Sequence, residues 1–207
     1  IYTVYDQDLR RTTAMKVLPP QILHQEPKVS SFIEESRITA QLEHPNIVPI
    51  HEIGVIEGSS LPYYTMKLID GEPLTNVIRM VAREDPDYVR HYTRHRLLDI
   101  FLKVCNAVAY AHSHGVIHRD IKPSNVLLNN EGIPKLADFG LARIEAKKEQ
   151  HTRTGAMLVT IDYMSPEQRR DTAGVDHRSD LWSLGATFYE MLTGEPPHPV
   201  EMESIPE

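Results

Sequence analysis

The sequence predicts an α+β fold of two lobes, a small β-rich N-terminal lobe with one helix and a larger α-helical C-terminal lobe. Short β-like runs occupy the first third of the 207-residue chain, and longer runs with apolar residues at helical spacing occupy much of the remainder. The pattern changes at Asp70-Gly71. We therefore expect an N-terminal lobe over residues 1–69 and a C-terminal lobe over residues 70–207, which together form one domain.

Four short segments predict the strands of the N-terminal lobe: Ile1–Tyr5, Thr13–Leu18, Ile50–Ile56 and Tyr63–Leu68. A helical pattern lies between the second and the third of them, over Ser31–Leu42. Ser31 followed by Glu34 is typical of a capping box, in which the two side chains satisfy backbone N–H groups at the start of a helix. We expect the helix to begin at Ser31 and to be carried by a small sheet.

Two long helices are predicted in the C-terminal lobe, over Arg94–His114 and Ser179–Thr193, and a glycine follows each of them as a stop. Their apolar residues recur along one stripe, which should be buried: Leu97, Phe101, Val104, Val108 and Ala111 in the first helix, and Leu181, Trp182, Leu184, Phe188 and Leu192 in the second. Between the helices we expect short strands at Val126–Leu128 and Lys135–Ala137 and a polar loop at Glu145–Thr154. The stretch Ala82–Tyr92 receives no function.

Composition excludes several classes of protein. The formal net charge of -7 argues against a nucleic-acid partner, because such a partner requires a basic face. The single cysteine, Cys105, rules out an intrachain disulfide and favours a reducing compartment. No apolar run reaches the roughly 18 residues that a membrane span needs. We expect a cytoplasmic domain, whose full-length parent could still be anchored to a membrane.

One group of residues carries the chemistry that phosphoryl transfer requires. Magnesium ions prefer hard oxygen ligands, which the carboxylate of Asp138 and the amide oxygen of Asn125 supply. A second carboxylate, Asp120, can accept the proton of an attacking hydroxyl, and Lys122 can neutralise the migrating phosphate. These residues stand in two short runs, His118-Arg119-Asp120 to Asn125 and Asp138-Phe139-Gly140.

The two runs match H-R-D-x-x-x-x-N and D-F-G, so the sequence resembles the protein kinase superfamily. Lys122-Pro-Ser-Asn125 resembles its serine/threonine branch, and Tyr163-Met-Ser-Pro-Glu-Gln168 resembles the bacterial Hanks-type kinases. The resemblance implies transfer of the γ-phosphoryl group of ATP-Mg²⁺ to Ser or Thr hydroxyls of protein substrates, with Mn²⁺ as an alternative ion. It also implies a kinase homodimer as the partner for autophosphorylation.

Further residues take roles from the same resemblance. Ala14-Met15-Lys16 is similar to the V-A-I-K motif, whose lysine binds the α and β phosphates and pairs with a helical glutamate. Glu34 and Glu35 compete for that pairing, and we choose Glu35 because of its distance from His44-Pro45-Asn46. Glu34 then serves the helix cap.

The adenine pocket is also placed by resemblance. Met66 would guard its back, and the backbone groups of Lys67 and Ile69 would bind the base. Three apolar residues would contact the base or lead to it, although plain core packing explains them equally well: Ala14, Leu127 and Ile1.

The resemblance extends downstream. Ser165-Pro166-Glu167 is similar to the A-P-E motif, and Asp180 would bond the backbone around Arg119. His118 would pack under Phe139. Phosphorylated threonines, held by Arg119, are expected at Thr152 and Thr154, while Thr160 would contact Asp120 and Lys122.

Other interpretations remain open beside an active kinase. The family's glycine-rich loop would precede Ile1, and its last helices would follow the Asp180 helix; their absence from the chain predicts a fragment of a longer kinase. It also motivates a catalytically impaired nucleotide-binding pseudokinase or scaffold, and a pure interaction module is a third hypothesis. A metal hydrolase built on His112, His114 and His118 is disfavoured, because the first two fall at a helix end where imidazole complements the dipole.

Overall fold

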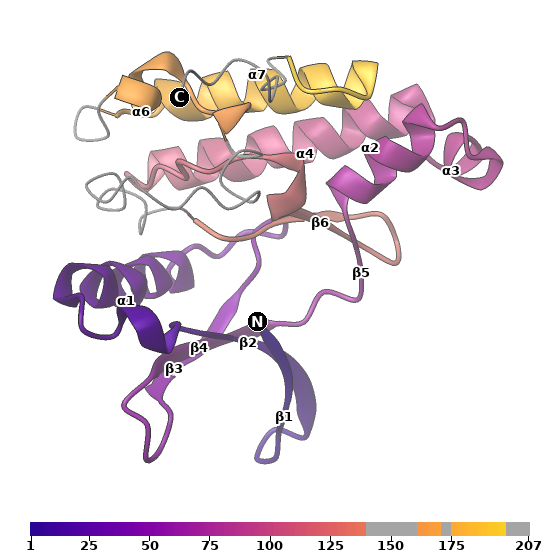
Figure 1. Cartoon of the computed structure of the whole chain (residues 1–207). Helices are drawn as coiled ribbons and strands as arrows, with labels where there is room; N and C mark the ends of the chain where they lie inside the picture. Colours follow the sequence, from indigo (N-terminus) through magenta and orange to yellow (C-terminus); the bar gives the residue numbers. More distant parts are fainter. Residues whose placement is uncertain (140–160, 171–174, 198–207) are drawn as a thin grey trace, which may run out of the picture.

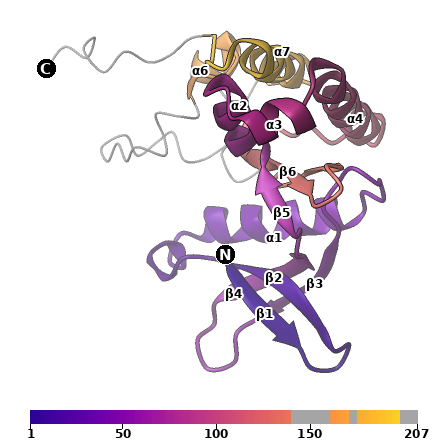
Figure 2. The same cartoon turned by 90° about the vertical axis from the view of Figure 1, so that its right-hand side faces the viewer.

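The computed structural model describes residues 1–139, 161–170 and 175–197. The described chain forms a sheet-bearing half with one long helix and a helical half (Figure 1). A turned view shows β5 (Gly71–Pro73) rising from the first half toward the second (Figure 2). The α+β prediction with two lobes of unequal helix content is confirmed.

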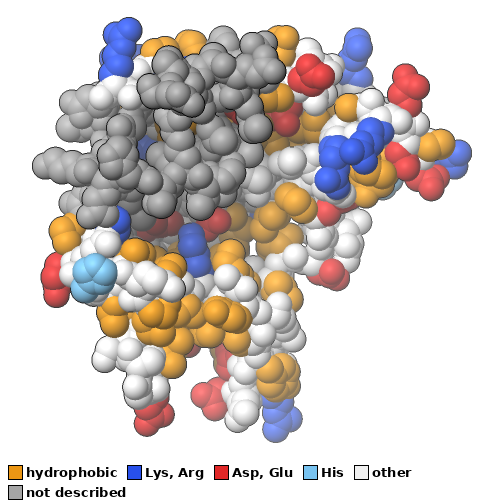
Figure 3. Space-filling view, in the orientation of Figure 1, with side chains coloured by type: hydrophobic (Ala, Val, Ile, Leu, Met, Phe, Trp, Pro, Cys, Tyr) orange, Lys and Arg blue, Asp and Glu red, His pale blue; other side chains and the backbone are white. Residues whose placement is uncertain are grey.

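The N-terminal lobe is an antiparallel four-stranded sheet in the order β1-β2-β4-β3. The strands are β1 (Tyr2–Asp6), β2 (Arg11–Val17), β3 (Ile50–Val55) and β4 (Pro62–Lys67). Inward residues of β2, β3 and β4 form one apolar cluster with Phe32 of the helix α1 (Glu26–Ala40). Hydrophobic side chains gather over this lobe in the space-filling view, and acidic and basic side chains meet at its boundary with the second lobe (Figure 3).

The predicted start of α1 at Ser31 is wrong. The helix begins at Glu26, with Gln25 as its N-cap residue and no side-chain cap. Pro27 lies in the first turn, where its missing N–H costs nothing and its fixed φ favours a helix. Ser31 therefore lies inside the helix, and the predicted capping role of Glu34 is also wrong; Glu34 is exposed and pairs with Arg37 at 3.9 Å.

The C-terminal lobe is built from helices and a small sheet in the order β5-β6-β7. The small sheet adds β6 (Val126–Asn129) and β7 (Pro134–Leu136) to β5. The helices are α2 (Leu74–Ala82), α3 (Pro86–His91), α4 (Arg94–Ser113), α6 (Pro166–Arg170) and α7 (Arg178–Thr193), and short 3-10 turns stand at Pro20–Ile22 and Pro123–Asn125. A second apolar cluster joins α2, α4, α7 and the small sheet.

The ends of the two long helices follow their caps. Thr93 accepts a hydrogen bond from the N–H of Arg96 and so starts α4, while Gly194, with φ of 84°, ends α7. The unassigned stretch Ala82–Tyr92 contains α3, whose first N–H groups donate to the side chain of Asp85.

The predicted buried stripe of α7 is wrong at three positions. Leu181, Trp182 and Leu192 are exposed, whereas Leu184 is buried. The face of α7 that lies against the lobe carries polar residues as well, among them Asp180 and Glu190, because it contacts the backbone of His118 and the hydroxyl of Tyr163. Phe188 stacks on Phe101 of α4 at 4.4 Å between ring centroids.

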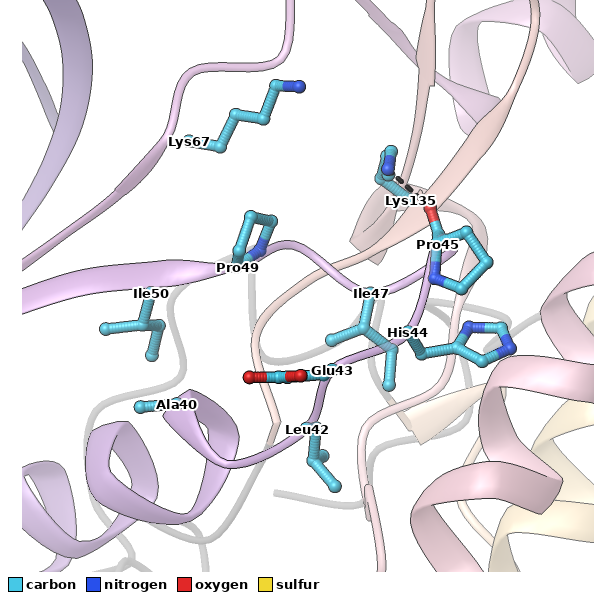
Figure 4. Close-up of a pocket in the computed structure, with 10 residues that line it drawn as sticks. All are labelled: Ala40, Leu42, Glu43, His44, Pro45, Ile47, Pro49, Ile50, Lys67 and Lys135. Atoms are coloured by element: carbon cyan, nitrogen blue, oxygen red, sulfur yellow. Dashed lines mark hydrogen bonds between the residues drawn. The ribbon is translucent and has the colours of Figure 1, made fainter.

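A loop between α1 and β3 ties the two lobes together. Leu136 of β7 donates its N–H to the carbonyl of Asn46 at 2.8 Å, and Val48 donates to the carbonyl of Leu136 at 2.9 Å. The Asn46 side chain donates to the carbonyl of Pro134 at 2.8 Å. Beside this joint lies an open hollow of about 410 Å³, into whose rim Lys135 extends to donate to the carbonyl of Pro45 (Figure 4).

Candidate active site

Lys16 of β2 reaches across the lobe boundary to Asp138, which follows β7. The Nζ atom of Lys16 lies 2.6 Å from Oδ1 of Asp138 and 3.9 Å from Oε1 of Glu35 on α1. Asp138 has φ of 57°, an uncommon backbone conformation for a residue with a side chain. Of the two glutamates that compete for the lysine in the sequence, the buried Glu35 faces it.

The charges around Lys16 keep it protonated. Burial by itself lowers the pKa of Lys16, but the neighbouring carboxylates of Asp138 and Glu35 outweigh that effect and raise the pKa above its ordinary value. Glu35 is only 5% exposed, and a buried carboxylate of this kind requires a cation nearby. The lysine therefore offers a permanent positive charge at the boundary between the lobes.

Asp120 lies within residues 118–125, the segment between α4 and β6 that we call the catalytic loop. Its Oδ2 atom is 3.1 Å from Nζ of Lys122 and accepts a hydrogen bond from Nδ2 of Asn125 at 3.0 Å. Asn125 also donates to the Asp120 carbonyl at 2.8 Å. With its amide nitrogen turned to Asp120, Asn125 has its Oδ1 oxygen left as the atom for a metal ion.

A backbone hydrogen bond joins this loop to the segment that carries Asp138. The backbone N–H of Ala137, the residue before Asp138, donates to the carbonyl of Asn125 at 2.9 Å. The predicted lysine, proton acceptor and metal ligands therefore lie in one continuous site rather than in separate ones. Two lobes contribute to it, since Lys16 and Glu35 belong to the first and the others to the second.

Asp180 of α7 holds the catalytic loop from below. Its fully buried carboxylate accepts hydrogen bonds from the backbone N–H groups of His118 at 2.8 Å and Arg119 at 2.7 Å. Nε2 of His112 lies 2.7 Å from the same carboxylate. Arg119 has φ of 66°, so the two backbone bonds compensate for a strained conformation.

His118 is a neutral core residue. It is fully buried, its ring lies 4.4 Å from that of Phe139 between centroids, and burial lowers its pKa. Its Nδ1 atom accepts from the N–H of Asp120 at 3.2 Å, so the other nitrogen carries the proton and donates to the carbonyl of Ala137 at 3.1 Å. Within the described residues no trio of His, Cys, Asp or Glu could hold a metal ion, and the hydrolase interpretation finds no support there.

Two side chains of α6 bond neighbouring segments, and one of them reaches Arg119. Gln168 of α6 donates its side-chain N–H to the carbonyl of Arg119 at 2.9 Å, and Glu167 accepts from the hydroxyl of Ser179 at 2.8 Å. Burial lowers the pKa of Arg119, whose Nε and one terminal nitrogen are buried with no hydrogen-bond partner in the described part of the chain. Four predicted residues lie outside the described residues: Gly140, Thr152, Thr154 and Thr160.

The predicted adenine contacts lie at the edge of the N-terminal apolar cluster. Ala14 and Met66 are buried within it, and Ile69 and Leu127 pack partly buried against it. Ile1, in contrast, is 71% exposed. The N–H of Lys67 donates to the carbonyl of Pro49 at 3.0 Å, so only the carbonyl of Lys67 could accept a hydrogen bond from the base.

Three residues of the site were missed from the sequence: Tyr64, His112 and Gln168. Tyr64 faces Lys16 because the two are paired across β2 and β4, and no local pattern reveals which residues of two strands are partners. The sequence suggests for His112 only a contact with a helix dipole or a zinc site. Its place at the end of α4, close to His118, is the signal that could have indicated contact with the catalytic loop.

Comparisons with known proteins identify the family of the chain. The sequence profile of the protein kinase domain matches residues 1–206. The chain is 36% identical over 199 residues to the serine/threonine-protein kinase PknB of Mycobacterium leprae, covering 95% of this chain and 30% of that protein. It is 36% identical over 197 residues to the DNA damage-responsive serine/threonine-protein kinase RqkA of Deinococcus radiodurans, covering 95% of this chain and 28% of that protein.

Solved structures give the same result. The crystal structure of the PknI kinase domain of Mycobacterium tuberculosis superposes with a TM-score of 0.69 at 26% identity, covering all of this chain and 72% of that one. The chain spans less than a third of the curated relatives it matches.

Proposed function

Since this chain belongs to the protein kinase family, we propose that it transfers the γ-phosphoryl group of ATP to Ser or Thr hydroxyls of protein substrates. One observation carries the proposal: Lys16 contacts Asp138, the backbone N–H just before Asp138 donates to Asn125, and Asn125 donates to Asp120, so the four residues share one site between two lobes. The complete set favours an active kinase over a catalytically impaired one.

The oxygen donors of the site suit a hard cation. Asp138 offers a carboxylate and Asn125 an amide oxygen, which are the ligand types that Mg²⁺ prefers, and Mn²⁺ can use the same ligands. A bound ion of this kind neutralises charge on the phosphates. Lys16 would bind the α and β phosphates, and Glu35 would keep its ammonium group in place.

The residues of the catalytic loop would act on the substrate. The substrate hydroxyl oxygen forms the new bond to the γ phosphorus as the bond to the bridging β,γ oxygen breaks, and ADP leaves with that oxygen. The carboxylate of Asp120 accepts the hydroxyl proton. Lys122, 3.1 Å from Asp120, neutralises charge on the transferred group.

Regulation by phosphorylation belongs to the same proposal. The partly buried guanidinium of Arg119 would bind a phosphate on Thr152 or Thr154, which adds a charge of about -1.5 to -2 and three acceptor oxygens. Thr160 would help to form the substrate groove. A second copy of the kinase would act as the partner for autophosphorylation.

We also propose a cellular location for the domain. No helix in the described ranges has the length and apolar character needed to span a bilayer. We place the domain in the cytoplasm, where ATP and protein substrates occur, with lobes over residues 1–69 and 70–207.

The test compares the wild-type protein with Asp120→Asn. With radiolabelled ATP-Mg²⁺ and a generic protein substrate, the wild type should label Ser and Thr, and the variant should lose most of the rate while its melting temperature still rises with ATP. Equal labelling by both proteins would remove Asp120 from its role.

A further inference from the structure

Tyr64 lies directly across the sheet from Lys16. The two residues are paired between β4 and β2, so their side chains stand next to each other on the same face of the sheet. That face is the one covered by α1, and Tyr64 is only 3% exposed. A phenol is thus built into the apolar cluster immediately beside the site lysine.

Two contacts fix the phenol. Its ring lies 5.3 Å from the ring of Phe32 between centroids, and Phe32 is three positions before Glu35 on α1. The Nζ atom of Lys16 lies 5.7 Å from the centre of the Tyr64 ring. Tyr64 therefore touches both the lysine and the helix that carries the lysine's glutamate.

The described charged and titratable groups facing Lys16 come from three elements: Glu35 from α1, Tyr64 from β4, and Asp138 after β7. Burial raises the pKa of Tyr64, while the charge of Lys16 and a side-chain hydrogen bond with it act in the opposite direction; the pKa stays above its ordinary value. The phenol is therefore neutral at physiological pH, and its oxygen can accept from the ammonium group.

We propose that Tyr64 is a positioning residue for Lys16, which keeps the ammonium group directed at the phosphates when Asp138 turns to a metal ion. This inference rests on the proposed function. Asp138 is the nearest partner of Lys16 at 2.6 Å, yet that function requires its oxygens for the ion. Glu35, at 3.9 Å, and the Tyr64 hydroxyl are then the groups that hold the lysine.

A neutral hydroxyl suits this role better than a third carboxylate. It accepts a hydrogen bond from the ammonium group without cancelling the positive charge that the phosphates need. Its position is set by the sheet register and by the Phe32 ring, so it does not move away when Asp138 does.

The variant Tyr64→Phe removes the hydroxyl and keeps the ring that packs on Phe32. Tyr63→Phe is the matched control, because Tyr63 is the next residue of β4, points to the other face and bonds Glu52 at 3.2 Å. The first measurement needs no nucleotide: the rate at which an amine-reactive acylating reagent modifies Lys16, followed by mass spectrometry at several pH values. Loss of the hydroxyl should hold the amine less firmly and raise that rate about fivefold at a given pH, the effect of one hydrogen bond.

The second measurement is steady-state phosphorylation with ATP-Mg²⁺. Tyr64→Phe should raise the KM for ATP about three- to tenfold and change kcat less than about twofold, whereas Tyr63→Phe should change neither. Unchanged Lys16 reactivity and KM in Tyr64→Phe, or equal effects of Tyr63→Phe, would overturn the proposal. If the wild type transfers no phosphate, the proposed function fails, and the acylation rates still decide whether Tyr64 holds Lys16.

Discussion

Lys16 and Asp138 form an ion pair at 2.6 Å although 122 positions separate them in the chain. The pair joins a strand of the first lobe to the residue that follows β7 in the second, and it places a permanent cation beside a candidate metal ligand.

Removing this cation should abolish most of the activity. Lys16→Met keeps the length of the side chain and should lower kcat/KM at least about a hundredfold, because it removes charge stabilisation in a partly enclosed site. The labelling assay with ATP-Mg²⁺ measures the effect. Lys103→Met is the control, since Lys103 pairs with Asp99 on the outer surface of α4; a comparable loss in that variant would contradict the assignment.

Asp180 should contribute strongly to stability. Asp180→Asn replaces an oxygen with an N–H donor against three groups that donate to the carboxylate, and we expect a loss of about 3 kcal/mol in the free energy of unfolding. Urea denaturation measures it. Asp99→Asn, at an exposed ion pair, should change stability by less than about 0.5 kcal/mol. A similar small change in Asp180→Asn would show that the three bonds contribute little.

Stability should fall in mild acid because of His118. Its pKa is lower in the folded state than in the unfolded chain, so protonation favours unfolding. The contribution is complete above the unfolded pKa of about 6.5 and is lost as the pH falls toward the folded pKa, at most about 1.4 kcal/mol per pH unit. Denaturation between pH 7 and pH 5 should therefore show a steeper decline for the wild type than for His118→Gln. Equal slopes would mean that His118 does not exclude the proton.

Replacing two glycines with alanine should change the stability of the protein in opposite directions. A Cβ atom at Gly71 would overlap the carbonyl oxygen of Leu128, so Gly71→Ala must separate β5 from β6 and should cost about 3 kcal/mol or more. A Cβ atom at Gly185, inside α7, meets nothing within 4 Å, and Gly185→Ala should stabilise the protein by about 0.5–1 kcal/mol. Thermal melting distinguishes the signs, and a stable Gly71→Ala variant would contradict the close approach of the two strands.

Sequence patterns predicted the elements whose extent depends on residues close together in the chain. The extent of α4 followed from its apolar stripe and from Gly115, and the strands other than β5 followed from short β-forming runs. The start of α1 was missed because the first turns bury no residue before Phe32, which removes the apolar signal used to find helices. The exposure of Leu181 on α7 was missed because helical spacing identifies a stripe but not the element that covers it.

The residues of the candidate site also fall into those that the sequence predicted and those that it did not. Asp120, Asn125 and Asp138 stand in short motifs, so the resemblance of these motifs to those of protein kinases is enough to predict that they lie together. The pairing of Lys16 with Tyr64 depends on the register of two strands that are distant in the chain, and that register is decided by burial of a whole face.

The hydrogen bonds between the Asn46 loop and β7 fix the C-terminal end of α1 relative to the larger lobe, so α1 can rotate about that end. The Ala40 end is tied through that loop to the larger lobe, whereas the Glu26 end has no such anchor among the bonds of the joint. When the lobes swing apart, the Glu26 end should sweep the widest arc and Glu35 a smaller one. A modest rotation would then be enough to withdraw Glu35 from Lys16. Asn46→Ala, which loosens the joint, should uncouple the movement of the lobes from the distance between Glu35 and Lys16.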